Sequence, residues 1–400
     1  MNKQILEGSQ AIAQTINNIK PAVISAYPIT PQTHIVEDLA KFKADGKATY
    51  EYVRAESEFA AASIVTGASA TGVRVYTATS SQGVLLMTEV LFNIAGMRLP
   101  IVLTCANRGI SAPITIWNDH QDAMTIRDAG WIHFFAENHQ EAVEQHILAY
   151  KIAETVKIPV MVNIDGFVLT HTYEGVSIPT SADIKKFLPD YVPEKGKYLD
   201  PAHPVTLGSF ASPAYYMEIR EELHHDLRSS LHLINHEYGL LKKTIPDVIK
   251  TPEKKAIVHD GLIEYYGPKN PKTVLIAMGS VCGTIKDVID SHNGRLDETP
   301  LLTSGTGLIK IKTFRPFPAD EILKIVKSAR EVAVIEKSIS LGATDGPLAL
   351  DVKAAIKNKA ITKVQDFIVG LGGRDITGNM IKDIIKLVRK NSDKTTFIGK

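Results

Sequence analysis

Strand-length apolar runs alternate with segments of helical periodicity along most of this chain, and that alternation limits the fold more than any other feature. In 84–94, apolar residues spaced three or four positions apart form one helical face, and the apolar run 100–104 follows directly. Similar strand-length runs stand at 22–26, 74–78 and 160–164. Alternating strands and helices favour a parallel sheet with helices on both faces. The sequence therefore predicts an α/β fold.

The alternation breaks once and then resumes, which predicts two domains. Prolines interrupt 167–204, so we expect an extended arm there. Ser212 and Pro213 then begin a helix whose apolar stripe ends near Gly239. Beyond a polar, proline-broken stretch, strand-length runs return at 273–278, 309–312, 332–335 and 364–369. We expect a first domain at 1–245, a linker at 246–256 and a second domain at 257–400.

Charge and cysteine content exclude several classes of function. The 400 residues include 45 Lys and Arg against 44 Asp and Glu, a formal net charge of +1, so neither nucleic acid nor a membrane surface is an expected partner. Cys105 and Cys282 cannot supply the four thiolates of an iron–sulfur or zinc site. His232 and His236 lack a carboxylate in metalloprotease spacing, so no metal ligand is predicted. No signal peptide or membrane span is recognisable, and we expect a cytoplasmic protein.

Polar residues follow four of the expected strands, at the edge where parallel α/β sheets bind their ligands. In the turn 27–30, Thr30 either caps the next helix or offers its hydroxyl to a ligand. Glu56 and Glu58 stand at the start of a helix, where acids also complement the helix dipole. The hydroxyl-rich turn 77–83 is suited either to helix capping or to binding an anion. Arg108 ends another strand and is suited to a surface ion pair or to gripping a carboxylate.

Together these motifs resemble those of the alpha subunit of 2-oxoacid:ferredoxin oxidoreductases, and of the pyruvate enzymes most closely. The resemblance extends over nearly the whole chain, and the joint order and spacing of its motifs make it specific. It rests on Tyr27-Pro28-Ile29-Thr30-Pro31, Glu56-Ser57-Glu58, Thr77 to Gly83, Gly96 to Pro100, Asn107-Arg108, Trp117 to Asp122, Phe314 to Pro318 and Phe367 to Asp375.

The resemblance implies a thiamine diphosphate enzyme. Its alpha chain has a pyrimidine-binding domain, a parallel sheet flanked by helices, followed by a transketolase C-terminal-like α/β domain. Glu58 would hydrogen-bond N1′ of the aminopyrimidine and favour its imino tautomer, with Glu56 as the alternative two residues away. The cofactor would also contact Tyr27, Pro28 and Ile29.

The resemblance further implies that Thr30 and Arg108 act with Glu58 as the catalytic residues, holding the carboxylate and carbonyl of the substrate. The implied reaction is the oxidative decarboxylation of pyruvate with coenzyme A to acetyl-CoA and CO₂, reversibly, with electrons passing to ferredoxin. Such a chain is one subunit of a hetero-oligomeric oxidoreductase.

One motif of thiamine enzymes is missing from the chain. No Asp-Gly pair is preceded by glycine, so the Gly-Asp-Gly pattern that binds Mg²⁺ and the diphosphate is absent. The resemblance then implies that Mg²⁺ and the [4Fe-4S] clusters belong to partner subunits, namely the beta, gamma and delta chains. We expect a cofactor site shared between subunits and a chain that is inactive alone.

Two other functions stay open at this point. The first is the same chemistry on another 2-oxoacid, such as 2-oxoisovalerate, 2-oxoglutarate or an aryl pyruvate, because pocket volume is not readable from sequence. The second is a non-catalytic structural subunit of such a complex. The joint presence of Thr30, Glu58 and Arg108 disfavours the structural role. An NAD-dependent dehydrogenase is also disfavoured, because the glycines at 370–373 lack the full dinucleotide fingerprint.

Overall fold

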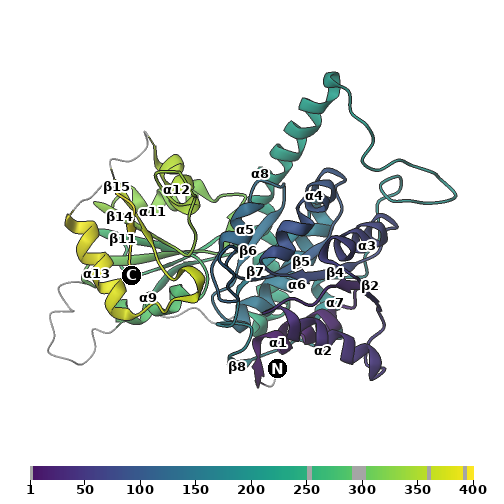
Figure 1. Ribbon diagram of the computed structural model, residues 1–400, viewed down its shortest axis with the longest axis horizontal. Coiled ribbons are helices and arrows are strands. Elements are labelled where there is room, and N and C mark those ends of the chain that lie inside the picture. The colour runs from purple at the N-terminus through teal and green to yellow at the C-terminus, as the bar shows by residue number, and fades with distance from the viewer. Residues whose placement is uncertain (1–2, 250–254, 291–302, 358–361, 391–393) are drawn as a thin grey trace.

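The computed structural model describes residues 3–249, 255–290, 303–357, 362–390 and 394–400. Within these residues the chain forms two seven-stranded sheets and one two-stranded sheet. Helices cover both faces of each large sheet, and the two sheets lie side by side with a long helix between them (Figure 1). The predicted α/β class is therefore confirmed. None of the described helices is both long and apolar enough to span a bilayer.

The first sheet positions the predicted site. Its strands run in the order β13-β6-β7-β5-β4-β2-β3. Neighbouring strands are parallel throughout, except that β13 is antiparallel to β6. The strands are β2 (Val23–Ala26), β3 (Glu51–Arg54), β4 (Val75–Thr79), β5 (Val102–Asn107), β6 (Ile132–Phe135), β7 (Val160–Asp165) and β13 (Thr313–Arg315). Residues of β4, β5, β6 and β7 are buried along their whole length, which explains why these strands are apolar runs.

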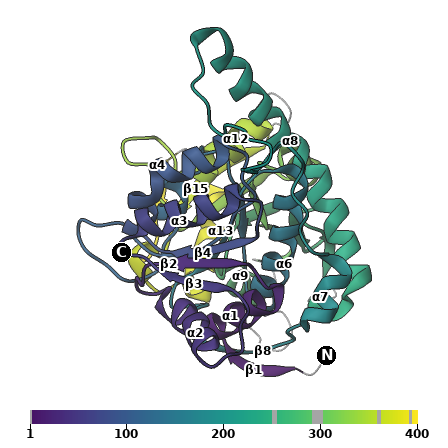
Figure 2. The same ribbon diagram turned by 90° about the vertical axis from the view of Figure 1, so that its right-hand side faces the viewer.

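Helices on opposite faces cover this first sheet. Two of them, α3 and α4, contact each other on one face, whereas α1 contacts both α2 and α6 on the other (Figure 2). A short helix, α5, precedes β6. The bounds are α1 (Gly8–Ile19), α2 (Thr33–Ala44), α3 (Glu58–Ala70), α4 (Gln82–Gly96), α5 (Gln121–Thr125) and α6 (His139–Val156).

The second sheet has the order β16-β15-β14-β11-β12-β10-β9. It is parallel except at β10, which is antiparallel to both of its neighbours. The strands are β9 (Ala256–His259), β10 (Ile263–Tyr266), β11 (Thr273–Ala277), β12 (Thr306–Ile311), β14 (Glu331–Glu336), β15 (Lys363–Ile368) and β16 (Thr396–Phe397). The helices are α9 (Val281–Asp290), α11 (Ala319–Val326), α12 (Pro347–Ile356) and α13 (Gly378–Lys390), with short 3₁₀ turns η1 (Pro246–Val248) and η2 (Leu371–Gly373).

The arm expected at 167–204 is only partly extended. It contains the helix α7 (Ser181–Phe187), where the expectation of an extended chain is wrong. It also contains an extended strand, β8 (Tyr173–Val176), which pairs with β1 (Gln4–Glu7). Pairing with a strand near the N-terminus stabilises β8, and no local pattern reveals such a partner. The helix that follows, α8 (Pro213–Thr244), continues past Gly239 because Leu241 is buried in the core. Its first turns project beyond both sheets (Figure 1).

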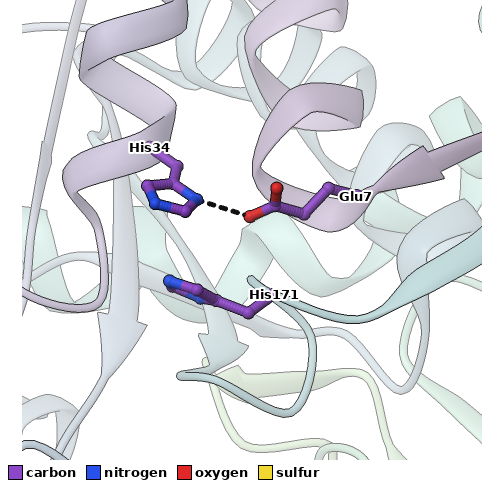
Figure 3. Close-up of side chains that lie close together, drawn as sticks. All are labelled: Glu7, His34 and His171. Atoms are coloured by element: carbon purple, nitrogen blue, oxygen red, sulfur yellow. Dashed lines mark hydrogen bonds and ion pairs between the residues drawn. The ribbon is translucent and has the colours of Figure 1, made fainter.

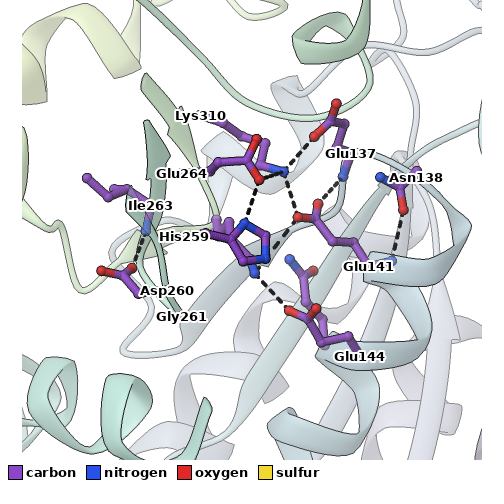
Figure 4. Close-up of polar contacts among 12 residues, drawn as sticks. Glu137, Asn138, Glu141, Glu144, His259, Asp260, Gly261, Ile263, Glu264 and Lys310 are labelled. Atoms are coloured by element: carbon purple, nitrogen blue, oxygen red, sulfur yellow. Dashed lines mark hydrogen bonds and ion pairs between the residues drawn. The ribbon is translucent and has the colours of Figure 1, made fainter. Parts of the chain in front are cut away.

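One strand and a buried ion network join the two halves of the chain. β13 lies in the C-terminal half of the sequence but joins the first sheet. Beside it, Glu137, just before α6, and Glu141, in its first turn, pair with Lys310 of β12 (Figure 4). Lys286 of α9 also pairs with Glu137. The network comprises Glu137, Glu141, Glu144, Glu264, Lys286, Lys310 and Lys312, all less than one tenth exposed. The predicted domain boundary at 246–256 stays a prediction, and residues 250–254 of it lie outside the described residues.

Candidate active site

The predicted residues come together at one edge of the first sheet. Thr30 follows β2, Glu58 begins α3 just after β3, and Arg108 directly follows β5. Between these strands lies β4, and the turn 79–83 leaves its end. Because the four strands are parallel neighbours, all of these residues lie at the carboxyl edge of the sheet.

Arg108 is buried, and hydrogen bonds to two backbone carbonyls orient its guanidinium. Its Nε donates to the carbonyl of Thr115 at 2.6 Å, and its Nη1 donates to the carbonyl of Thr30 at 2.9 Å. Among the described residues no carboxylate pairs with this guanidinium, so the surface ion pair does not hold. Burial lowers the pKa of Arg108, and the charge of Asp122 opposes that effect. Nη2 is the nitrogen left for a ligand.

Thr30 does not cap a helix. Helix α2 begins at Thr33, and its N-cap residue, Gln32, makes no side-chain cap hydrogen bond. Gln32 instead holds the turn before it, because its Nε2 donates to the carbonyl of Ala78 at 2.6 Å and its Oε1 accepts from the N–H of Ile29 at 3.3 Å. Thr30 is exposed, as are Tyr27 and Pro28, whereas Ile29 is half-buried. This turn is therefore rigid at its base and open to a ligand at its tip.

Glu58, rather than Glu56, has the environment of a functional carboxylate. Glu58 is 7% exposed, whereas Glu56 is exposed. Ser57 supplies the N-cap of α3, since its hydroxyl accepts from the N–H of Ala60 at 3.1 Å. A Cβ on Gly83 would lie 3.0 Å from Glu58 Oε1, so the absence of a side chain there makes room for this carboxylate. Within the described residues no hydrogen bond or ion pair reaches it.

The turn 77–83 offers further polar groups without partners. The hydroxyls of Thr77, Thr79 and Ser80 are fully buried and make no hydrogen bond in the described structure. The N-cap of α4, Ser81, has φ +46° and makes no side-chain cap hydrogen bond, so capping does not account for this turn. Buried polar groups usually have partners. Together with the Glu58 carboxylate, these hydroxyls fit a polar, nitrogen-containing ring such as the aminopyrimidine of thiamine.

Asp122 connects the turn after β4 with the end of β5, and sequence reasoning did not single it out as a site residue. Its fully buried carboxylate accepts from the N–H of Ser81 at 3.0 Å and from the N–H of Arg108 at 2.9 Å. Asn107 Nδ2 donates to it at 3.0 Å. Burial raises the pKa of Asp122 to about 6, and these hydrogen bonds oppose the rise. Asp122 therefore ties the turn after β4 to the end of β5.

Residues from the second half of the chain form hydrogen bonds with residues near the same edge. Asp165, at the end of β7, accepts from Lys337 at 2.5 Å and lies 2.6 Å from His120 Nε2. Burial alone would raise the pKa of Asp165, but the charges of Lys337 and His120 hold it well below its usual range. The N–H of Gly372 donates to Asp119 at 3.1 Å, so the glycine turn after β15 contacts the loop between β5 and α5.

Two family comparisons cover most of the chain. Residues 15–237 match the thiamine diphosphate-binding domain of pyruvate flavodoxin/ferredoxin oxidoreductases, and residues 272–384 match core domain II of pyruvate:ferredoxin oxidoreductases. The PorA subunit of pyruvate synthase from Methanocaldococcus jannaschii is 46% identical over 398 residues, which are 98% of this chain and 97% of that protein. The VorA subunit of ketoisovalerate oxidoreductase from Pyrococcus horikoshii is 37% identical over 97% of this chain and 94% of its own length.

A solved structure shares the fold. It is a 2-oxoglutarate:ferredoxin oxidoreductase from Magnetococcus marinus, with 2-oxoglutarate, coenzyme A and succinyl-CoA bound in it, and it matches with a TM-score of 0.70 at 19% identity. The match covers 96% of this chain and 65% of that one, so this chain spans about two thirds of its length. With the family matches and near full-length relatives, the chain belongs to the pyruvate:ferredoxin oxidoreductase family, which confirms the resemblance seen in its motifs.

Proposed function

We propose that this chain is the alpha subunit of a complex that oxidatively decarboxylates pyruvate with coenzyme A and passes the electrons to ferredoxin, in a reversible reaction. The buried Glu58 carboxylate, at the carboxyl edge beside Gly83, has no partner among the described residues, and this observation carries the proposal. The 46% identity to a pyruvate synthase subunit supports pyruvate as the substrate.

Thiamine diphosphate, when bound, supplies the carbon nucleophile for the carbonyl of a 2-oxoacid. Glu58 would hold a proton between its carboxylate and the pyrimidine nitrogen N1′. The turn 27–30 would contact the cofactor through Tyr27, Pro28 and Ile29. Arg108 would bind the substrate carboxylate through Nη2, and the Thr30 hydroxyl would donate to the substrate carbonyl.

Partner subunits complete the site in this proposal. Mg²⁺, the diphosphate site and the [4Fe-4S] clusters would belong to beta, gamma and delta chains, because this chain lacks the Gly-Asp-Gly motif and a cluster-binding cysteine set. The projecting start of α8 and the residues just before it support assembly with other chains, since they expose the large apolar side chains of Phe210, Tyr215 and Met217. Both cysteines are buried and unpaired, which supports a reducing, cytoplasmic location.

Two matched substitutions in the assembled complex test the role of Glu58. Glu58→Gln keeps the size of the side chain but removes its charge, so coenzyme A-dependent viologen reduction with pyruvate should fall by about 10²-fold or more. Glu56→Gln changes an exposed acid two residues away and should leave turnover within about twofold. Normal turnover in Glu58→Gln, with the complex intact, would contradict the assignment.

A second candidate is the same reaction on a branched 2-oxoacid. The 37% identity to a ketoisovalerate oxidoreductase subunit favours it, although less than the pyruvate synthase relatives favour pyruvate. Initial rates across pyruvate, 2-oxoisovalerate, 2-oxoglutarate and phenylpyruvate decide between these substrates. A higher kcat/KM for 2-oxoisovalerate than for pyruvate would move the assignment to the branched substrate.

A further inference from the structure

Three side chains from segments that are distant in sequence, Glu7, His34 and His171, lie close together (Figure 3). Glu7 ends β1, His34 lies in the first turn of α2, and His171 lies in the turn that follows β7. His34 Nδ1 is 2.7 Å from Glu7 Oε1, and the two imidazole rings lie 4.5 Å apart between centroids. One ligand atom from each of the three residues lies within 4.8 Å of the others.

These donors have the chemistry of a transition-metal site. Two neutral imidazoles and one carboxylate carry a net charge of −1, and the same donor types bind Zn²⁺ in three-ligand sites that keep an open position for water. Carboxylate-only clusters, in contrast, favour Mg²⁺ and Ca²⁺. Glu7 and His171 are half-buried, whereas His34 is exposed, so an ion can reach the cluster from solvent.

A neighbouring hydroxyl already orients one of the imidazoles. Thr170 Oγ1 lies 2.6 Å from His171 Nδ1, and it also accepts from the N–H of Phe167 at 2.8 Å. Such a bond to one ring nitrogen fixes the ring and leaves Nε2 for a metal, as outer partners do in established sites. The backbone also fixes Glu7, which is paired with Tyr173 in the β1–β8 sheet.

The cluster adjoins the candidate active site. His34 lies four residues beyond Thr30, on the helix that follows the turn 27–30. Phe167 contacts His171 with ring centroids 4.7 Å apart and contacts Trp117 at 4.6 Å, in the loop after β5. An ion at the cluster would therefore cross-link β1, α2 and the 167–171 turn next to the segments that carry the active site.

We infer that Glu7, His34 and His171 form a binding site for a divalent transition metal, Zn²⁺ foremost, which fixes the N-terminal strand against helix α2. No short sequence motif contains these ligands, because Glu7 and His34 alone are 27 residues apart. The site is independent of the thiamine and iron–sulfur chemistry of the proposed function, so either assignment can fail without the other.

Zinc content and affinity of the full-length chain test the inference. The chain is stripped with a chelator and dialysed. It is then titrated with Zn²⁺ against a chromogenic zinc indicator, and bound zinc is counted by mass spectrometry. We expect about one zinc per chain in the wild type. Glu7→Gln and the double variant His34→Ala/His171→Ala should bind at least tenfold more weakly.

A matched double variant separates this site from the other histidines. His232 and His236 are exposed and stand one turn apart on α8, so His232→Ala/His236→Ala removes the same number of imidazoles elsewhere. It should keep the wild-type affinity. Thermal unfolding by circular dichroism in a chelator verifies that each variant is folded, and added Zn²⁺ should raise the midpoint only where Glu7, His34 and His171 are intact. Stoichiometric zinc in His34→Ala/His171→Ala, or none in the wild type, would overturn the inference.

Discussion

Replacing Lys310 with methionine tests how the buried ion network joins the two halves of the chain. Lys310 is 2% exposed, and its Nζ lies 2.5 Å from Glu137, 2.6 Å from Glu141 and 3.3 Å from Glu264. Methionine keeps most of the length of the side chain but leaves these carboxylates without their shared cation. Removing one partner of a buried ion pair costs about 3–5 kcal/mol. At about 2 °C or more per kcal/mol for domains of this size, the thermal midpoint should fall by about 6 °C or more.

The dependence of this loss on pH identifies its cause. Burial alone would raise the pKa of Glu141, but the charges of Lys310 and Lys312 lower it to about 2. In the wild type this carboxylate therefore contributes stability at neutral pH, which is lost only as the pH falls through about 2. Without Lys310, burial dominates and raises the folded-state pKa above the unfolded value. The destabilisation should then be smallest near pH 5 and grow towards pH 8.

Two further variants complete the test, which is thermal unfolding of the purified chain followed by circular dichroism at pH 5 and pH 8. Lys324→Met removes a lysine that is 64% exposed and paired with Glu321 at 2.8 Å, and it should cost less than about 1 kcal/mol. Lys310→Met/Glu141→Gln removes one charge of each sign and should recover about half of the lost stability. Equal losses in Lys310→Met and Lys324→Met, or a loss in Lys310→Met that does not change with pH, would refute the reasoning.

Three other substitutions probe the active-site edge. Gly83→Ala places a Cβ 2.1 Å from Thr79 Oγ1, so it should lower turnover of the complex at least tenfold. Gly96 lies on the same helix, and a Cβ there would have no described atom within 4 Å, so Gly96→Ala should leave turnover unchanged. Asp122→Asn sets an amide against N–H donors and should cost about 1–3 kcal/mol in thermal unfolding, whereas Asp128→Asn, at a carboxylate 76% exposed, should cost little. Because the pKa of Asp122 is raised to about 6, the wild type should lose stability as the pH rises from 4 to 6. Asp122→Asn should abolish this loss. Arg108→Lys keeps the charge but loses the fork that reaches two carbonyls and a ligand together, so KM for pyruvate should rise about tenfold or more.

The sequence predicts the sheet strands well because their signal is local. Runs such as 160–164 are buried on both faces and therefore apolar at every position, and the strand observed there is Val160–Asp165. The same reasoning places Thr30, Glu58 and Arg108 at one edge, since the ends of adjacent parallel strands meet. What it cannot supply is a partner that is distant in sequence. The hydrogen bond from Gln32 to Ala78 spans 46 positions, and β8 pairs with a strand at the start of the chain.

Buried charge is the feature that local patterns represent least well. Lys310 and Lys312 flank Ile311, and such alternation of polar and apolar residues is typical of a strand with one face in water. Both lysines are instead 2% exposed or less, because carboxylates of α6 meet them at the boundary between the sheets. The strand predicted at 309–312 is observed as β12, which ends at Ile311, but another element determines the environment of its lysines. Asp122 was missed for the same reason.

Contacts from the second half of the chain hold the loop that precedes α5, beside the candidate active site. The loop between β5 and α5 carries Asp119, and Asp122 lies in the first turn of α5, the helix that precedes β6. Lys337 and Gly372 hold this loop from the second half, through Asn118 at 2.9 Å and Asp119 at 3.1 Å. Asp122 then transmits that placement to Ser81 and to Arg108 by direct hydrogen bonds. A change at Lys337 should therefore alter how substrate binds, although Lys337 itself lies behind the edge where the substrate would sit.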